Sequence, residues 1–221
     1  MRMRKKPNLV PRMEACADWW VREPEQLRGK WHSLMPSARE VRIEVGCGKG
    51  KFTVETAAAE PDVLLIALEI CPDAMVVGME KAKEMGLRNV FFVAMNVERI
   101  DEYFAPDEAD LLYINFCDPW PRKKNAKRRL TYHTFLEKYK TILKQGGQIH
   151  FKTDNAPLFA WSLEEFAAYG YETRNVTDDL HRDGPVGIMT GYEEKFYELG
   201  TPIHRCEIVI DKTKHEKEDE G

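Results

Sequence analysis

The segment VLLIALEI, residues 63–70, restricts the possible folds more than any other part of this chain. Seven of its eight residues are apolar, whereas a strand with one face in water alternates apolar and polar residues. Continuous apolar strands are typical of parallel sheets that helices cover on both faces. The segment therefore predicts an α/β fold.

From residue 41 onward, short apolar strands alternate with helices. We predict strands at residues 41–45, 63–70, 89–95, 109–116 and 148–154, and helices at residues 51–60, 73–85, 132–144 and 156–169. This series predicts a doubly wound, mostly parallel sheet with helices on both faces. Late strands at residues 171–176 and 203–210 bring the sheet to seven strands. Since only a short helix near residues 192–199 separates these two, we expect an antiparallel last strand.

The two ends of the chain differ in charge from its centre. We expect a basic N-terminal extension at residues 1–33, one α/β domain at residues 34–211 and a disordered acidic tail at residues 212–221. The extension begins with a cluster of cations, so we expect its first part to be a disordered arm. Its later part contains three tryptophans within residues 13–31, which we expect to pack a short helix onto the domain.

Composition excludes several classes of protein. The chain is 43% hydrophobic and 32% charged, which is typical of a soluble globular protein. It contains no apolar run near the roughly 20 residues that span a bilayer, and its basic start lacks the apolar centre of a secretory signal. The five cysteines are widely spaced and form no CxxC pair, so we expect reduced thiols in a cytoplasmic protein and no metal site.

A glycine-rich turn, Gly46-Cys47-Gly48-Lys49-Gly50, follows the first predicted strand of the sheet, where nucleotides bind in such folds. Its spacing is neither the GxGxxG of dinucleotide sites nor the GxxxxGK[ST] of a P-loop. A glycine turn alone is a weak signal.

Two acids sharpen the interpretation of this turn. Glu69 ends the second strand of the sheet, where a carboxylate accepts both hydroxyls of a ribose. Glu44 precedes the turn, where it would repel a pyrophosphate but suit a ligand with an ammonium and a sulfonium. We therefore predict a site for S-adenosylmethionine that includes Gly46 and Gly48. Asn96, just after the next strand, is a candidate contact to the adenine ring.

The segment DPWPRKKNAKRR, residues 118–129, directly follows the strand predicted at residues 109–116. It contains six cations and no acid after Asp118, in a chain of formal charge −4. Such a local cluster predicts contact with a polyanion. Trp120 offers a face on which a base can stack, worth about 1–3 kcal/mol. The alternatives are a solvated charged face and an Asp-Pro turn without a catalytic role.

Taken together, these motifs closely resemble those of the bacterial tRNA (guanine-N(7)-)-methyltransferases. The resemblance covers about residues 35–210 and rests on ExGxGxG at 44–50, DPWP with its basic run, TDN at 153–155 and TGYE at 190–193. It implies a Rossmann-like class I methyltransferase fold with S-adenosylmethionine as donor. It also implies that the acceptor is N7 of a guanine in the variable loop of tRNA.

The resemblance further implies roles for single residues. The donor positions are Glu44, Glu69, Asn96 and Asp118, and Asp118 is also the family's proposed catalytic residue. Arg122 stands where the family usually has Lys, and the positive charge at this position is the same in both. The run that contacts RNA includes Lys124, Lys127, Arg128 and Arg129, and the substrate positions are Asp154, Thr190, Gly191, Tyr192 and Glu193.

The chemistry of guanine fits this division of roles. Its Watson–Crick edge presents N–H donors, which Asp154 or Glu193 could accept. N7 has a lone pair and no proton, so no strong base is needed. We therefore expect Asp118 to orient the acceptor and to stabilise positive charge on the methylated ring.

Three other functions compete with this interpretation. One is a non-catalytic RNA-binding protein that keeps a vestigial donor fold. A second is a methyltransferase for an exocyclic amino group, although such enzymes commonly carry Asp/Asn-Pro-Pro-aromatic where this chain has Trp120 then Pro121. A nicotinamide dehydrogenase is the third, and Glu44 and the glycine spacing disfavour it. The sequence leaves a monomer and a homodimer equally open.

Overall fold

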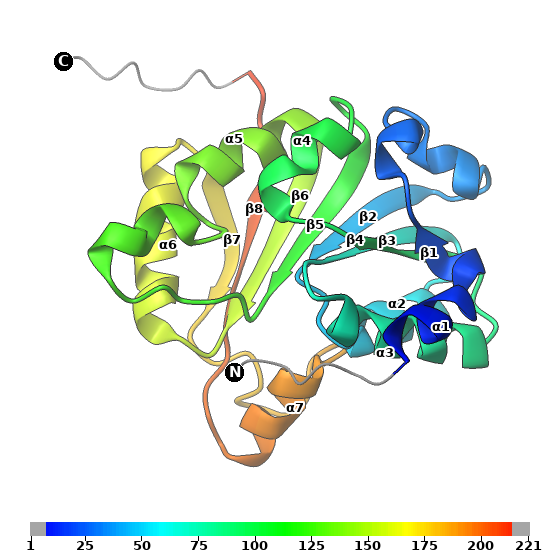
Figure 1. The fold of residues 1–221 in the computed structure, drawn as a ribbon. Helices are drawn as coiled ribbons and strands as arrows, with labels where there is room; N and C mark the ends of the chain where they lie inside the picture. The colour runs from blue at the N-terminus through cyan, green and yellow to red at the C-terminus, as the bar shows by residue number, and fades with distance from the viewer. Residues whose placement is uncertain (1–7, 214–221) are drawn as a thin grey trace.

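One eight-stranded sheet forms the centre of the computed structural model, which describes residues 8–213 (Figure 1). The order of its strands is β1-β4-β3-β2-β5-β6-β8-β7. The strands are β1 (Trp20–Val21), β2 (Glu40–Val45), β3 (Val63–Glu69), β4 (Val90–Ala94), β5 (Ala109–Asn115), β6 (Leu143–Thr153), β7 (Glu172–Thr177) and β8 (His204–Val209). The arm at residues 1–7 and most of the tail predicted at 212–221 lie outside the described residues.

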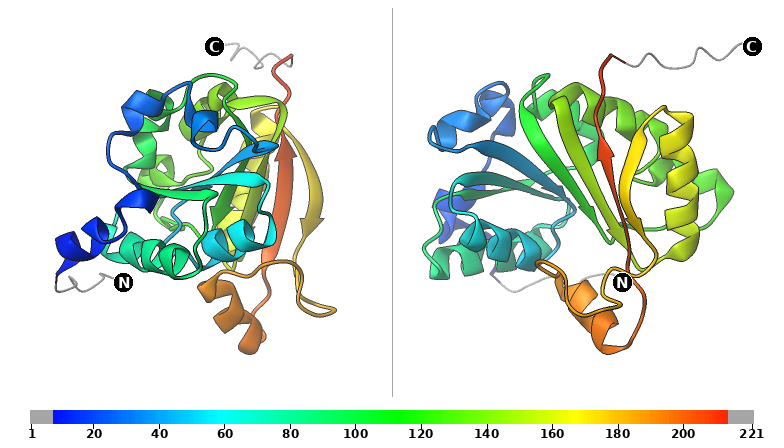
Figure 2. Two further views of the ribbon diagram at one scale, coloured as in Figure 1. Left: turned by 90° about the vertical axis from the view of Figure 1, so that its right-hand side faces the viewer. Right: turned by 180° about the vertical axis from the view of Figure 1, so that it is seen from behind.

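Helices cover both faces of this sheet. They are α1 (Leu9–Glu14), α2 (Lys51–Ala59), α3 (Pro72–Glu84), α4 (Ile100–Tyr103), α5 (His133–Ile142), α6 (Ala156–Ala168) and α7 (Gly191–Glu198). Figures 1 and 2 show α1, α2 and α3 on one face and α4, α5 and α6 on the other. Each face has its own core, with Met75 in one and Leu136 in the other. Residues 63–68 of β3 are at most 1% exposed, which confirms the parallel strand with two covered faces.

The strand β8 lies antiparallel between β6 and β7, which confirms the expected reversal at the end of the sheet. The remaining pairings, from β1 to β6, are parallel. The sheet has one strand more than the seven expected, because Trp20 and Val21 of β1 pair with the edge strand β4. A two-residue strand is too short to show periodicity in the sequence.

The described part of the N-terminal segment docks onto the sheet through its tryptophans. Trp31 is fully buried, stacks on Phe104 with ring centroids 4.9 Å apart, and donates a hydrogen bond to the carbonyl of Tyr103 at 2.9 Å. The helix expected within residues 13–31 is wrong in position: α1 ends at Glu14, and 3-10 turns and β1 follow. Trp19 ends a 3-10 turn, Trp20 lies in β1 and Trp31 begins a later 3-10 turn, so the tryptophans do not lie along one helical face.

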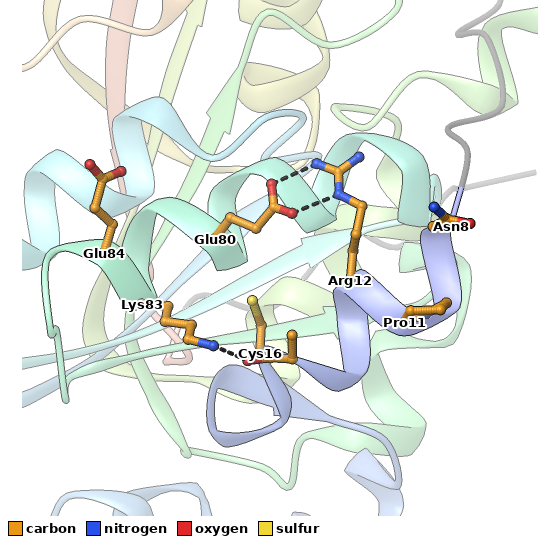
Figure 3. A pocket seen from close by; sticks show the side chains of 8 residues that line it. Asn8, Pro11, Arg12, Cys16, Glu80, Lys83 and Glu84 are labelled. Carbon is orange, nitrogen blue, oxygen red and sulfur yellow. Dashed lines mark hydrogen bonds and ion pairs between the residues drawn. The ribbon is translucent and has the colours of Figure 1, made fainter.

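The helix α1 is held against α3 by charged groups, as Figure 3 shows. The guanidinium of Arg12 donates two hydrogen bonds of 2.6 Å to the carboxylate of Glu80. Lys83 donates to the carbonyl of Ala15 at 2.5 Å. A groove of about 600 Å³ lies between the two helices, and none of the predicted site residues lines it. Every helix within residues 8–213 is too short or too polar to span a lipid bilayer.

A histidine on β6 makes the stability of the fold depend on pH. Burial, with the nearby charges of Arg205, Arg42 and Lys152, lowers the pKa of His150 to about 4. In the unfolded chain the pKa of a histidine is about 6.5, so the unfolded state binds more protons between these values. The stability that His150 contributes is therefore complete above pH 6.5 and is lost as the pH falls towards 4.

We expect the free energy of unfolding in urea to fall by on the order of 2 kcal/mol through this histidine between pH 6.5 and 4. His150→Gln should remove that part of the pH dependence, because glutamine does not titrate. The measurement is urea unfolding at several pH values for both proteins. Equal pH dependence in the two would contradict the assignment.

Candidate functional site

The predicted site residues meet at one edge of the sheet. The strands from β2 to β6 run parallel, so their carboxyl ends lie together, and Figures 1 and 2 show α7 beside them. The glycine turn follows β2, Glu69 ends β3, Asn96 follows β4, and Asp118 follows β5. Asp154 directly follows β6. The structure therefore brings these segments to the edge where doubly wound folds bind ligands.

The glycine turn after β2 needs glycine at three positions. Gly46, Gly48 and Gly50 have φ values of 76°, 57° and 70°, a region that side chains rarely adopt. A Cβ atom on Gly46 or Gly48 would meet nothing within 4 Å, so this side of the turn is open. A Cβ atom on Gly50 would lie 2.8 Å from the Cα of Gly78 in α3. The first two glycines leave space beside the turn, and the third allows α2 and α3 to pack closely.

The carboxylate of Glu69 connects two loops at the edge of the sheet. It accepts hydrogen bonds from the backbone N–H of Gly48 at 2.8 Å and of Cys71 at 2.9 Å. One bond goes to each oxygen, and a carboxylate has about four lone-pair positions, so it can accept two more donors. Asn96 begins a 3-10 turn, with its side-chain oxygen accepting from Glu98 N–H at 3.1 Å. Both side chains are thus held in place and remain partly exposed.

The acid Glu44 is buried, with 2% of its surface exposed. It accepts hydrogen bonds from the hydroxyl of Thr53 and from Nδ2 of Asn115, the latter at 3.1 Å. Burial raises the pKa of the Glu44 carboxyl, and these hydrogen bonds and the charge of Lys152 oppose that shift. The acid is therefore held inside the domain beside the turn.

The buried amide of Asn115 leaves one acceptor without a partner. Its Oδ1 receives no hydrogen bond from residues 8–213. An unpartnered buried oxygen is costly unless a ligand or water supplies a donor. Together with Glu44 and Glu69, it forms a group of acceptors that fits the ammonium and hydroxyl groups of S-adenosylmethionine. Because these positions present acceptors, they suit this cofactor better than a phosphate-bearing one.

The loop after β5 presents Asp118 to solvent. Two residues near it, Phe116 and Trp120, have positive φ values of 55° and 40°. Burial and the charge of Asp118 raise the pKa of the neighbouring Cys117 thiol to about 12. Within residues 8–213, no donor or cation pairs with the carboxylate of Asp118, so it is open to a ligand.

The basic run forms the 3-10 helix Lys123–Arg128, which begins after Arg122. Lys124, Lys127 and Arg128 are exposed there. The guanidinium carbon of Arg128 lies 3.6 Å from the ring centroid of Trp120, so one face of that ring is already covered. Arg129 differs from the others, since it is partly buried. The cations therefore do not form one uniform surface.

The segment at α7 contains one carboxylate that is fully engaged inside the protein. Glu193 is completely buried and accepts from Lys152 Nζ at 2.7 Å and from His181 Nε2 at 2.9 Å. Because His181 Nδ1 accepts from the N–H of Val186 at 3.1 Å, its proton is on Nε2. Glu193 also closes a capping box with Thr190 at the start of α7. Its carboxylate faces inward.

The other substrate positions are more open. Asp154 is partly exposed, and none of the described residues donates a hydrogen bond to its carboxylate. Tyr192 is 65% exposed, and Gly191 begins α7. Of the two acids Asp154 and Glu193, Asp154 is thus the one that a ligand can reach directly.

Sequence reasoning missed several residues of this region. Asn115 directly follows the apolar run of β5, and Lys152 follows Phe151 in β6; polar residues at such positions need partners when they are buried. That signal was available, but the partners, Glu44 for Asn115 and Glu193 for Lys152, come from distant segments. His181 lies in a long loop where no pattern marks it.

Comparisons with known proteins show the family to which this chain is similar. The family model described as "Putative methyltransferase" matches residues 38–206. A tRNA (guanine-N(7)-)-methyltransferase of Geobacillus thermodenitrificans is 43% identical over 210 residues, which is 95% of this chain and 97% of the relative. The protein of that name from Bacillus subtilis is 41% identical over 209 residues, covering 94% and 98%.

Solved structures share the fold at much lower identity. The 16S rRNA methyltransferase KamB superposes with a TM-score of 0.65 at 15% identity, covering 83% of this chain and 93% of that one. A 16S rRNA (adenine(1408)-N(1))-methyltransferase with its cosubstrate SAM has a TM-score of 0.61 at 14% identity, covering 85% and 92%. At this identity the likeness concerns the fold alone.

We predict that Gly50→Ala destabilises the protein by about 3 kcal/mol, because the new methyl group overlaps Gly78 and the backbone has a positive φ. Gly86→Ala is the matched control, with a φ of +64° and open space around the site. It should lose only about 1 kcal/mol. Urea unfolding measures both, and equal losses would show that the contact with α3 is unimportant.

We also predict that Glu193→Gln lowers the free energy of unfolding by about 3 kcal/mol, because it leaves the buried ammonium of Lys152 without a charged partner. Asp154→Asn should change it by less than about 0.5 kcal/mol, since its carboxylate is unpaired at the surface. Thermal and urea unfolding give both values. A larger loss for Asp154→Asn would contradict this division.

Proposed function

This chain belongs to the family of the tRNA (guanine-N(7)-)-methyltransferases, and we propose that the residues at the strand ends carry out that reaction on a guanine in the variable loop of tRNA. The enzyme transfers a methyl group from S-adenosylmethionine to N7 of guanine in tRNA. The observation that carries the proposed assignment of residues is the group of acceptors beside the open glycine turn. It faces the same edge of the sheet as the exposed carboxylate of Asp118.

We propose that four residues hold the donor. Glu69 accepts hydrogen bonds from the ribose hydroxyls with the lone pairs that its backbone contacts leave free. Glu44 and Oδ1 of Asn115 favour the ammonium group, since both present acceptor atoms inside the domain. Asn96 lies where it can contact the adenine ring. Gly46 and Gly48 keep the space beside the turn clear.

The role proposed for Asp118 is positioning and electrostatic stabilisation. S-adenosylmethionine supplies a methyl group on a sulfonium, which a lone pair can attack directly. Because guanine N7 carries no proton, Asp118 need not act as a base. A fixed carboxylate near the ring stabilises the positive charge that develops there, and orienting N7 supplies much of the acceleration.

The substrate side of the site combines base recognition with phosphate contact. We propose that Asp154 accepts the N–H donors of the guanine edge, whereas Glu193 holds α7 in place. Arg122, Lys124, Lys127 and Arg128 lie where they can contact phosphates of the tRNA. A base that stacks on Trp120 must use the face that Arg128 leaves open, or displace Arg128. All five cysteines carry free thiols, in keeping with the cytoplasmic location that we propose.

The direct test is nucleoside analysis of unmodified tRNA after treatment with the protein and labelled S-adenosylmethionine. We expect label in 7-methylguanosine, and no label when the guanine of the variable loop is replaced by adenine. Label in another nucleoside would overturn the reaction proposed here. Label that persists in the substituted tRNA would overturn the position only.

The role of Asp118 is tested by Asp118→Ala at saturating concentrations of both substrates. We expect kcat to fall by about 10²–10³, as for other groups that stabilise charge in a transition state. Asp62→Ala is the control, an exposed acid that pairs with Arg39 at the opposite edge of the sheet. A kcat within about threefold of the wild type for Asp118→Ala would exclude both orientation and charge stabilisation.

A further inference from the structure

One cation of the basic run has different contacts from the rest. The guanidinium of Arg129 donates from Nε to the carbonyl of Pro119 and from Nη2 to the carbonyl of Trp120, both at 3.1 Å. Its carbon lies 4.2 Å from the ring centroid of Trp161 on α6. We propose that Arg129 is a positioning residue, which fixes the Asp118 loop for catalysis and does not contact RNA phosphates. The inference rests on the function proposed for Asp118.

The Asp118 loop needs such support because its own backbone provides little. Proline has no N–H group, so Pro119 and Pro121 cannot donate hydrogen bonds that would fix the turn. The positive φ values of Phe116 and Trp120 each cost about 1–3 kcal/mol, and such conformations persist only where surrounding contacts hold them. Arg129 supplies two donors to consecutive carbonyls within this loop. These bonds hold the backbone directly beside Asp118.

The other side of Arg129 is anchored to the helices. Trp161 stacks with Tyr132, with ring planes 6° apart, and the N–H of Tyr132 donates to the carbonyl of Arg129 at 3.0 Å. Tyr132 directly precedes α5. The guanidinium therefore lies between a rigid aromatic pair and the loop. Its planar fork presents donors on two separate nitrogen atoms at a fixed spacing, whereas a lysine carries its three donors on one nitrogen atom.

The remaining cations do not share this arrangement. Lys124 and Lys127 are exposed, and none of their ammonium groups donates a hydrogen bond to the described residues. Arg128 lies over Trp120 but is also exposed. Arg129 thus directs two of its five N–H donors at the backbone of the Asp118 loop. Positive charge in this run has two separate purposes.

The test separates geometry from charge. Arg129→Lys keeps the charge and loses the fork, so kcat at saturating tRNA and donor should fall roughly tenfold to a hundredfold, as for other misplaced reacting groups. The KM for tRNA should change by less than about threefold, and the salt dependence of tRNA binding should stay unchanged even in Arg129→Gln. Lys127→Gln is the matched comparison, in which the slope of log K against log salt should fall by about 0.7 to 0.9.

A second variant keeps every cation in place. Trp161→Leu removes the ring beneath the guanidinium, and it should lower kcat severalfold with an unchanged salt slope. Wild-type kcat in Arg129→Lys or in Trp161→Leu would overturn the inference, as would a salt slope in Arg129→Gln that falls as in Lys127→Gln. If the wild-type protein forms no 7-methylguanosine, the proposed function fails and this inference fails with it. If only the Arg129 variants behave unexpectedly, the proposed function stands.

Discussion

The buried ammonium group of Lys152 connects the two halves of the site. On one side it forms an ion pair of 2.7 Å with Glu193, in the first turn of α7, and it approaches the carbonyl of Ile188. On the other side its charge acts on the Glu44 carboxyl beside the glycine turn. Buried charges are tolerated only when they are paired or hydrogen-bonded: Lys152 pairs with Glu193, whereas Glu44 is held by Thr53 and Asn115 and is also favoured by the charge of the lysine. One lysine on β6 therefore acts on an acid of the proposed donor side and on an acid of the proposed substrate side.

Much of the fold follows from patterns within single segments. The uninterrupted apolar residues of β3 can be satisfied only between two layers of helices, and the parallel strand order then places every loop of the site at one edge. The strand β1 could not be predicted, because two residues show no period and their pairing depends on a distant partner, Phe92. The short helix of the N-terminal segment was misplaced for a similar reason. Tryptophans identify a docking segment, but not its conformation.

The sequence predicts which segments lie together at the candidate site. It does not predict what each side chain in those segments contacts. Glu44, Glu69, Asn96, Asp118 and Asp154 are identifiable because each lies at or just after the carboxyl end of a strand. Glu193 lies in the TGYE motif and Arg129 in the basic run after DPWP, yet the side chains of both contact protein atoms. A motif records which residue types occur at which spacing. Whether an acid or a cation faces a ligand or the protein interior depends on partners such as Lys152 and Trp161, which lie far away in the sequence.

The position of β8 has a consequence for how the molecule is assembled during synthesis. This strand lies between β6 and β7 and contacts both, although it is the last of the eight to leave the ribosome. Until it emerges, β7 has no neighbour in the sheet and β6 has an unpaired edge. Unpaired edges favour association with other chains. A nascent chain that lacks β8 therefore leaves the β6 side of the sheet unpaired, and the last strand covers it.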